Sequence, residues 1–140
     1  SEVRLQAWFA MLRASIETGG EMEQRLMVFE EVDNGTDPDR PLIYLWEIVG
    51  LDGGVVGRYV GKASRGARRP RTHYTRNVNN ILAGRPYRKG KPDEFRKIHC
   101  TMAEALKAGC KLRLSFLSNI PAGENINAIE QMWQRYFGLR

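Results

Sequence analysis

The chain has few of the side chains that cross-link small proteins or bind transition metals. Its 140 residues include only two cysteines, Cys100 and Cys110, and two histidines, and these four residues do not follow a metal-ligand spacing. This composition excludes a disulfide-stapled miniprotein and a zinc-finger type of domain. Two reduced thiols suit a cytoplasmic, intracellular protein, which is our expectation for its location.

Long apolar runs are also absent. No run approaches the ~20 residues that a membrane-spanning helix needs, and the first residues lack the charged region and apolar core of a secretory signal. With 42% hydrophobic residues, the chain can nevertheless build one ordinary domain with its own core. We therefore expect a soluble protein that has no membrane partner.

Positive charge is concentrated in one part of the chain. Between Lys62 and Lys97, twelve lysines or arginines stand against two acidic residues, a local charge of +10, whereas the whole chain carries +6. The first 41 residues hold nine acidic residues and four arginines. A basic block of this kind is typical of proteins that follow a phosphate backbone, although a lone block is also compatible with a solvated surface.

Hydrophobic spacing predicts most of the remaining secondary structure. Four amphipathic helices are expected, over residues 3–16, 69–82, 95–108 and 126–137. Alternating residues predict a strand at 111–117, and the stretch 26–32 is compatible with a short strand or a helical turn. No internal repeat or low-complexity tract interrupts this order, so a single folded unit is expected.

Two short apolar runs predict a β-hairpin near the middle of the chain. Residues 42–49 are rich in β-branched and aromatic side chains, residues 51–54 supply a turn, and residues 55–61 resume the apolar run. In such a hairpin, Tyr44 and Tyr59 can point toward one shared face. A tyrosine on a strand is more often a residue at the edge of the core than a catalytic one, so the hairpin alone is a weak functional signal.

The hairpin resembles the signature of the GIY-YIG nuclease family, in which a Gly-Ile-Tyr strand is followed by a Tyr-Ile-Gly strand. The matching residues are Leu42-Ile43-Tyr44 and Tyr59-Val60-Gly61, with Leu42 in place of the first glycine. The resemblance extends from residue 42 to the end of the chain. It implies a compact fold with a three-stranded sheet and an active site that cleaves phosphodiester bonds.

Further positions match the site residues of that family. Arg69 and His73 lie where the family places an arginine and, one helical turn later, a histidine or tyrosine. Lys62 follows the signature glycine, as in a subgroup that resembles restriction and phage-type endonucleases. Glu130 resembles the family's single metal-binding glutamate and implies one Mg²⁺ or Mn²⁺ ion per active site. It also lies on an otherwise apolar helix face, where a carboxylate needs a charge partner or a metal.

The chemistry implied by the resemblance explains these residue types. The planar fork of Arg69 can grip two phosphate oxygens. The resemblance suggests Tyr44 as the base that activates water, with Tyr59 and His73 positioning the water or the phosphate. A tyrosine is a poor base unless a nearby cation lowers its pKa, and Lys62 and Arg69 are the candidates for this effect.

Other basic residues near these positions are candidates for DNA contacts. Because Pro70 separates Arg69 from His73, a neighbouring arginine, either Arg68 or Arg71, is an alternative phosphate-binding residue. Residues 83–92 form a basic loop rich in glycine and proline, a composition typical of DNA-contacting loops. The expected DNA-binding residues are Arg65, Arg68, Arg71, Arg76, Arg85, Arg88, Lys89 and Lys91.

The sequence thus predicts an α+β protein with a small three-stranded mixed sheet flanked by helices. Residues 1–41 are expected to form an N-terminal helical extension with an acidic connector, and residues 42–140 a GIY-YIG-like nuclease domain. The implied function is a metal-dependent, restriction-like endonuclease that acts on double-stranded DNA. The alternative is a non-catalytic nucleic-acid-binding module on the same fold. Trp8 and Phe9 in the extension suggest a homodimer or higher homo-oligomer.

Overall fold

The computed structural model describes residues 26–87, 90–91 and 95–139. Over these residues the chain is an α+β protein with a four-stranded mixed sheet, three α-helices and one π-helical turn. The helix expected at residues 3–16 lies outside the described residues. The elements are, in order, β1 (Glu30–Val32), β2 (Leu42–Val49), β3 (Val55–Ala63), η1 (Arg69–His73), α2 (Tyr74–Leu82), α3 (Lys97–Lys107), β4 (Lys111–Asn119) and α4 (Ile126–Tyr136).

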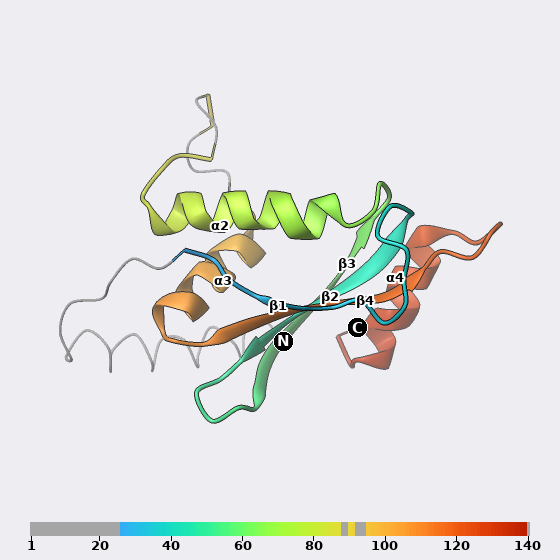
Figure 1. The fold of residues 1–140 in the computed structure, drawn as a ribbon, viewed down its shortest axis with the longest axis horizontal. Helices are drawn as coiled ribbons and strands as arrows, with labels where there is room; N and C mark the ends of the chain where they lie inside the picture. The colour runs from blue at the N-terminus through green and yellow to red at the C-terminus, as the bar shows by residue number, and fades with distance from the viewer. Residues whose placement is uncertain (1–25, 88–89, 92–94, 140) are drawn as a thin grey trace.

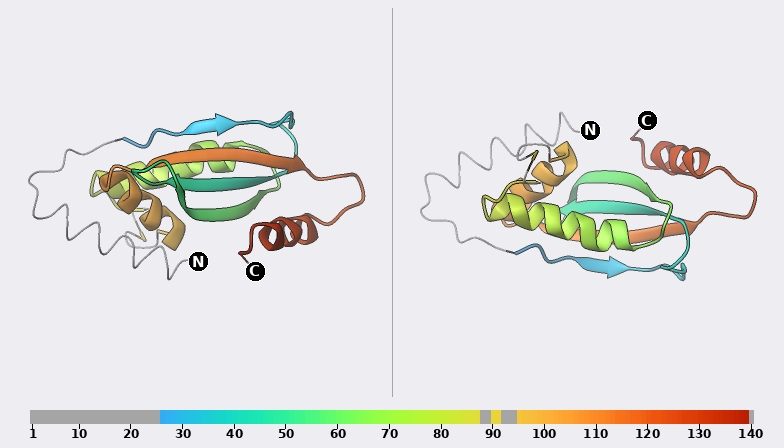
Figure 2. Two further views of the ribbon diagram at one scale, coloured as in Figure 1. Left: turned by 90° about the horizontal axis from the view of Figure 1, so that it is seen from below. Right: turned by 90° about the horizontal axis from the view of Figure 1, so that it is seen from above.

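The strands of the sheet lie in the order β1-β4-β2-β3, with β1 and β3 at the two edges (Figure 2). β2 is antiparallel to both β3 and β4, whereas β1 runs parallel to β4. The predicted number of three strands is wrong, because the ambiguous stretch 26–32 contributes the fourth strand. β1 has only three residues, too few for a periodic pattern, and it forms because its backbone pairs with Arg113–Ser115 of β4.

The central strand β2 is buried on both faces of the sheet. Leu42, Tyr44 and Trp46 pack in a core with α2 and α3, whereas Ile43 and Leu45 pack in a second cluster with residues of α4. Figure 1 shows α2 along one side of the sheet, and Figure 2 shows α4 beside the β3 edge. Along β2 and along β3, the side chains of consecutive residues therefore point to opposite faces of the sheet. This alternation decides which of the predicted site residues can contact one another.

The helix predicted for residues 69–82 begins and ends where expected, but its first turn is wide. The backbone N–H of Tyr74 donates to the carbonyl of Arg69, five residues earlier, so η1 is a π-helical turn that continues into α2. Pro70 lies in this first turn, where its missing N–H costs least. Arg69 and His73 consequently belong to one turn beside the sheet.

The fourth strand is fastened to the domain by an arginine of that turn. The guanidinium of Arg71 donates to both carboxylate oxygens of Glu31 on β1, over 2.7 and 2.8 Å. The same guanidinium lies 5.2 Å from the ring centroid of Phe116 on β4. The side-chain amide of Asn34 also donates to the carbonyl of Phe116. These contacts join the short strand to β4 and to the start of the helical layer.

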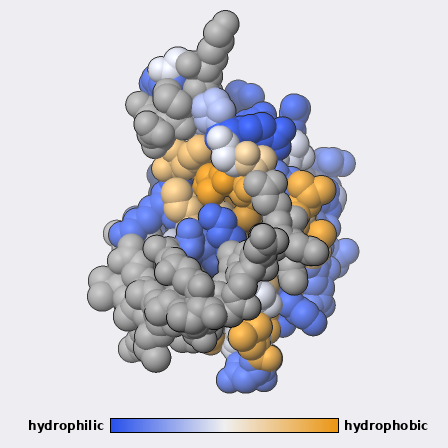
Figure 3. Space-filling model, turned by 90° about the vertical axis from the view of Figure 1, so that its left-hand side faces the viewer, coloured by the Kyte–Doolittle hydropathy of each residue, from blue (hydrophilic) through white to orange (hydrophobic). Residues whose placement is uncertain are grey.

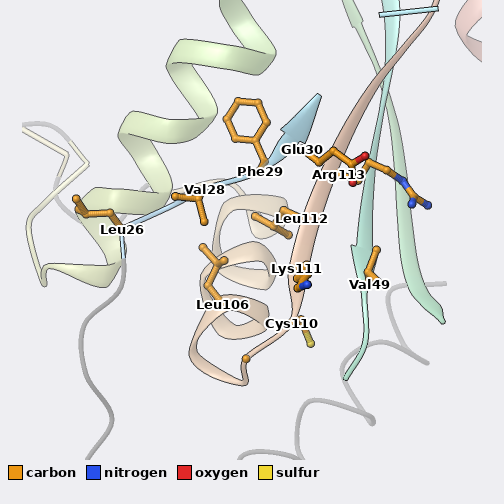
Figure 4. Close-up of a pocket in the computed structure, with 11 residues that line it drawn as sticks. Leu26, Val28, Phe29, Glu30, Val49, Leu106, Cys110, Lys111, Leu112 and Arg113 are labelled. Carbon is orange, nitrogen blue, oxygen red and sulfur yellow. The ribbon is translucent and has the colours of Figure 1, made fainter. Parts of the chain in front are cut away.

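An apolar cavity of about 580 Å³ lies between β1, the end of α3 and the start of β4 (Figure 4). Leu26 and Val28 line it while remaining 71% and 73% exposed. Figure 3 shows apolar surface gathered on the side of the molecule that lies at the left in Figure 1. None of the predicted site residues lines this cavity.

Candidate active site

The hairpin brings the two signature tyrosines to one face of the sheet, as predicted. In the register of β2 and β3, Tyr44 lies opposite Gly61 and Trp46 lies opposite Tyr59. Side chains that are opposite one another in an antiparallel pair share a face, so Tyr44 and Tyr59 both face the core that contains α2 and α3. Tyr44 is fully buried, and Tyr59 is half-buried.

Gly61 is needed because the ring of Tyr44 lies across it. A Cβ atom at residue 61 would lie 2.5 Å from both Cζ and Oη of Tyr44, inside van der Waals contact. The ring is also held from other sides, because it packs edge-on against Tyr74 with centroids 5.7 Å apart. The last glycine of the signature therefore sets the position of the Tyr44 hydroxyl.

Gly61→Ala is expected to destabilise the protein by about 1–3 kcal/mol, the usual cost of overpacking a core. At an ordinary strand glycine, the same substitution would stabilise the protein, because alanine loses less conformational entropy on folding than glycine does. Urea denaturation measures the change. The matched control is Gly90→Ala, because a Cβ at this residue meets nothing within 4 Å. Equal stabilities for Gly61→Ala and the wild type would show that Tyr44 moves aside freely.

The tyrosine hydroxyls form one connected polar network with an arginine. The Tyr44 and Tyr74 hydroxyls lie 2.8 Å apart, within hydrogen-bond distance. Arg96, at the start of α3, donates to the Tyr59 hydroxyl over 2.6 Å and to the Tyr74 hydroxyl over 3.5 Å. Side chains from β2, β3, α2 and the start of α3 thus converge on one small polar region beside the core.

Sequence reasoning assigned no role to Tyr74, Arg96 or His99. His99 is buried and packs edge-on against Tyr74, with ring centroids 5.0 Å apart. Its Nδ1 atom has no hydrogen-bond partner among the described residues. Tyr74 follows His73 directly, but neither Arg96 nor His99 is near the hairpin in sequence. Only the packing of α3 against α2 brings them together, so no local motif could have identified them.

Burial controls the protonation of the network. It lowers the pKa of His99 to about 4, helped by the nearby charges of Arg96 and Arg69, so this imidazole is neutral at pH 7. Burial also raises the pKa of Tyr44, with Tyr59 adding to the effect. Arg69 lowers that pKa, as predicted, but burial outweighs its effect. Lys62, the other cation predicted to do so, is not among the charges that act on Tyr44. In the free protein Tyr44 is therefore a protonated hydroxyl rather than a ready base.

Arg69 and His73 lie in η1 beside this network. Arg69 is exposed and close enough to act electrostatically on Tyr44 and on His99. His73 is half-buried, and its pKa is lowered by burial and then by the charges of Arg76, Arg68 and Arg69. A neutral His73 can accept a proton at neutral pH.

The other two predicted catalytic residues lie on the opposite face of the sheet. Lys62 is opposite Ile43, whose side chain belongs to the cluster under α4. The ammonium group of Lys62 donates to the side-chain oxygen of Asn127 on α4. Glu130 lies one helical turn after Asn127. The structure therefore groups Lys62 with Glu130 and Tyr44 with Tyr59, and strand β3 separates the two groups.

The surroundings of Glu130 suit a metal ion that is bound by one protein carboxylate, with water and substrate as its other ligands. Its carboxylate is half-buried and forms no hydrogen bond or ion pair with the described residues. No group of three or more histidine, cysteine, aspartate or glutamate side chains in the described ranges could hold an ion together. Mg²⁺ is often bound through one or two carboxylates, with water and phosphate completing its shell. The side chains present thus suit an ion that substrate helps to bind, and they do not form a closed protein cage.

The predicted DNA-binding residues differ in their contacts and in their exposure. Arg71 is occupied by its bidentate pair with Glu31, whereas Arg88 and Lys89 lie outside the described residues. The others are exposed: Arg65, Arg68, Arg76, Arg85 and Lys91. The exposed set follows β3, α2 and the loop after α2. This basic surface comes from the same stretch of the chain as Arg69.

Comparisons with known proteins add no identification. A scan against protein-family models, a search of curated proteins and a search of solved structures each find no match to this chain. Within the part of the chain that the structure describes, no helix has the length and apolarity to span a bilayer. Only the side chains and their geometry therefore indicate a function.

Proposed function

We propose that the protein is a metal-dependent DNA endonuclease with a GIY-YIG-like site. The observation that carries the proposal is the network of Tyr44, Tyr74, Arg96 and Tyr59, with Arg69 beside it. Three phenol hydroxyls and two guanidinium groups form a donor-rich environment. Such an environment matches the charge of a phosphodiester and the charge that develops during its cleavage.

In this proposal each side chain has a limited task. Arg69 grips the phosphate and stabilises its charge. The protonated Tyr44 orients the attacking water or donates to a phosphate oxygen, and the neutral His73 is a candidate to accept the proton of the water. Glu130 would hold Mg²⁺ or Mn²⁺, whose chemistry is to neutralise charge on phosphate oxygens. The basic surface positions the duplex.

The second candidate function is nucleic-acid binding without cleavage. Two observations favour it: burial keeps Tyr44 protonated, and Glu130 lies on the face of the sheet opposite the tyrosines. A binding module needs the basic surface but neither of these two side chains.

A nicking assay separates the two functions. Supercoiled plasmid is incubated with the purified protein in Mg²⁺, in Mn²⁺ and in EDTA, and the products are resolved on a gel. The endonuclease predicts nicked or linear DNA only when the metal is present. Retarded but uncut plasmid in all three buffers would support the binding module and contradict the proposal.

The basic loop after α2 is expected to contribute to DNA affinity and not to chemistry. Neutralising Arg85, Arg88, Lys89 and Lys91 together should weaken binding and flatten its dependence on salt. The log-log slope should fall by roughly 0.9 for each phosphate contact that is lost. Cleavage at saturating enzyme should persist, because phosphate contacts from a loop position the duplex and do not carry out the chemistry.

Fluorescence anisotropy at several salt concentrations measures the slope. The matched control neutralises four other exposed cations, Arg40, Lys107, Lys111 and Arg135. Equal slopes for the two quadruple variants would show that the loop faces solvent in the complex. The DNA path would then have to follow the part of α2 that carries Arg76.

A further inference from the structure

Arg96 is held in place by aromatic hydroxyls. Its guanidinium donates to Tyr59 over 2.6 Å and to Tyr74 over 3.5 Å. It also lies 5.8 Å and 6.0 Å from the centroids of these two rings. A planar fork presents five N–H donors, and two tyrosine hydroxyls leave most of them available. The two tyrosines therefore orient the Arg96 guanidinium and leave N–H donors that a ligand can use.

Three other arginines near the sheet differ from Arg96, because each is paired with a carboxylate. Arg58 and Arg113 both pair with the buried Glu47, each over 3.0 Å, and Arg71 pairs with Glu31. Carboxylates thus neutralise the guanidinium groups that have a structural task. These pairs connect elements of the fold and compensate the charge of each arginine.

Arg96 and Arg69 lack such a partner. Neither forms an ion pair with a carboxylate of the described residues, and both act electrostatically on Tyr44 and His99. His99 adds no positive charge, because its imidazole is neutral at pH 7. Two positive charges that have no carboxylate partner among the described residues act on the same hydroxyl cluster and repel each other. An anion between them would remove that repulsion.

We propose that Arg96 and Arg69 together clamp the non-bridging oxygens of one phosphodiester, with Tyr59 and Tyr74 as positioning residues for Arg96. This inference rests on the proposed function and names a second residue that touches the substrate. His99 supports the clamp indirectly, because its ring packs against Tyr74. The ligand class is a nucleic-acid phosphodiester, since a planar guanidinium fork matches a pair of phosphate oxygens.

Two measurements on Arg96→Ala and Arg96→Lys test the clamp. The first is the single-turnover rate of DNA cleavage at saturating enzyme. We expect a fall of ~10²-fold for the alanine variant and a smaller fall for lysine, which keeps the charge but loses the fork. The second is the ³¹P chemical shift of a dinucleotide, a single phosphodiester, titrated in EDTA so that nothing is cleaved. The shift should change with wild-type protein and not with Arg96→Ala.

Lys107→Ala is the matched control, because it removes a positive charge from the far end of the same helix. It should behave as wild type in both measurements. Tyr59→Phe separates positioning from folding: the cleavage rate should fall while DNA affinity and melting temperature stay unchanged. A rate for Tyr59→Phe equal to wild type would remove the positioning role.

The outcomes separate this inference from the proposed function. In one outcome, Arg96→Ala matches Lys107→Ala both in cleavage rate and in the ³¹P shift change of the dinucleotide, while Arg69→Ala is impaired. This result would contradict the clamp and leave the endonuclease proposal intact. If wild-type protein produces no dinucleotide shift, the clamp is also wrong. If wild-type protein changes the ³¹P shift of the dinucleotide, Arg96→Ala does not, and neither protein nicks plasmid, the phosphate clamp is supported and the endonuclease proposal is contradicted.

Discussion

Glu130→Ala is expected to slow metal-dependent DNA cleavage by at least ~10³-fold while leaving DNA binding intact. A catalytic metal stabilises the transition state by several kcal/mol, and about 4 kcal/mol corresponds to this factor in rate. Glu130 is the half-buried carboxylate on α4 and has no ion-pair partner among the described residues. Its removal takes away a negative charge and no cation, so the affinity for a polyanion should not fall.

The measurement compares plasmid nicking with binding of the same DNA in EDTA. Glu124→Ala is the matched control, because Glu124 is an exposed carboxylate just before α4 and lies outside the proposed site. It should nick DNA at the wild-type rate. Metal-dependent nicking that survives in Glu130→Ala would remove Glu130 as the metal ligand and direct the search to other carboxylates.

Arg69→Ala is expected to reduce the cleavage rate by ~10²-fold or more, the usual loss when one donor that stabilises transition-state charge is removed. Arg69 is exposed, lies at the start of η1 and acts electrostatically on the buried Tyr44. Arg68→Ala should mainly weaken binding, because Arg68 is exposed and is not among the charges that act on Tyr44. Rate and affinity measured separately distinguish the two variants.

Arg71→Ala tests which of the two arginines that flank Pro70 binds the phosphate. Because the bidentate pair with Glu31 is partly exposed, its loss should cost at most ~1 kcal/mol of stability and little activity. If Arg71→Ala were inactive and Arg69→Ala fully active, the phosphate-binding arginine would have been assigned to the wrong residue. The melting temperature of Arg71→Ala checks that any loss of activity does not come from unfolding.

The hairpin is the part of the site that the sequence predicted best. Runs of β-branched and aromatic residues and a Gly-rich turn predict the pairing of β2 with β3. Because side chains alternate along a strand, this pairing gives Tyr44 and Tyr59 a shared face. The same local rules predicted the helical stretch 69–82, the strand at 111–117 and the helix with Glu130. These features depend on residues that are close in sequence, so short-range patterns are sufficient.

The sequence by itself determined the α+β class, the tyrosine hairpin and the concentration of positive charge after it. Only the tertiary structure decided that β1 joins the sheet, that Arg96 meets Tyr59, and that Glu130 lies across the sheet from Tyr44. It also decided the protonation of Tyr44, because burial depends on which helices cover β2. Each of these depends on segments distant in sequence, whose packing no local pattern encodes.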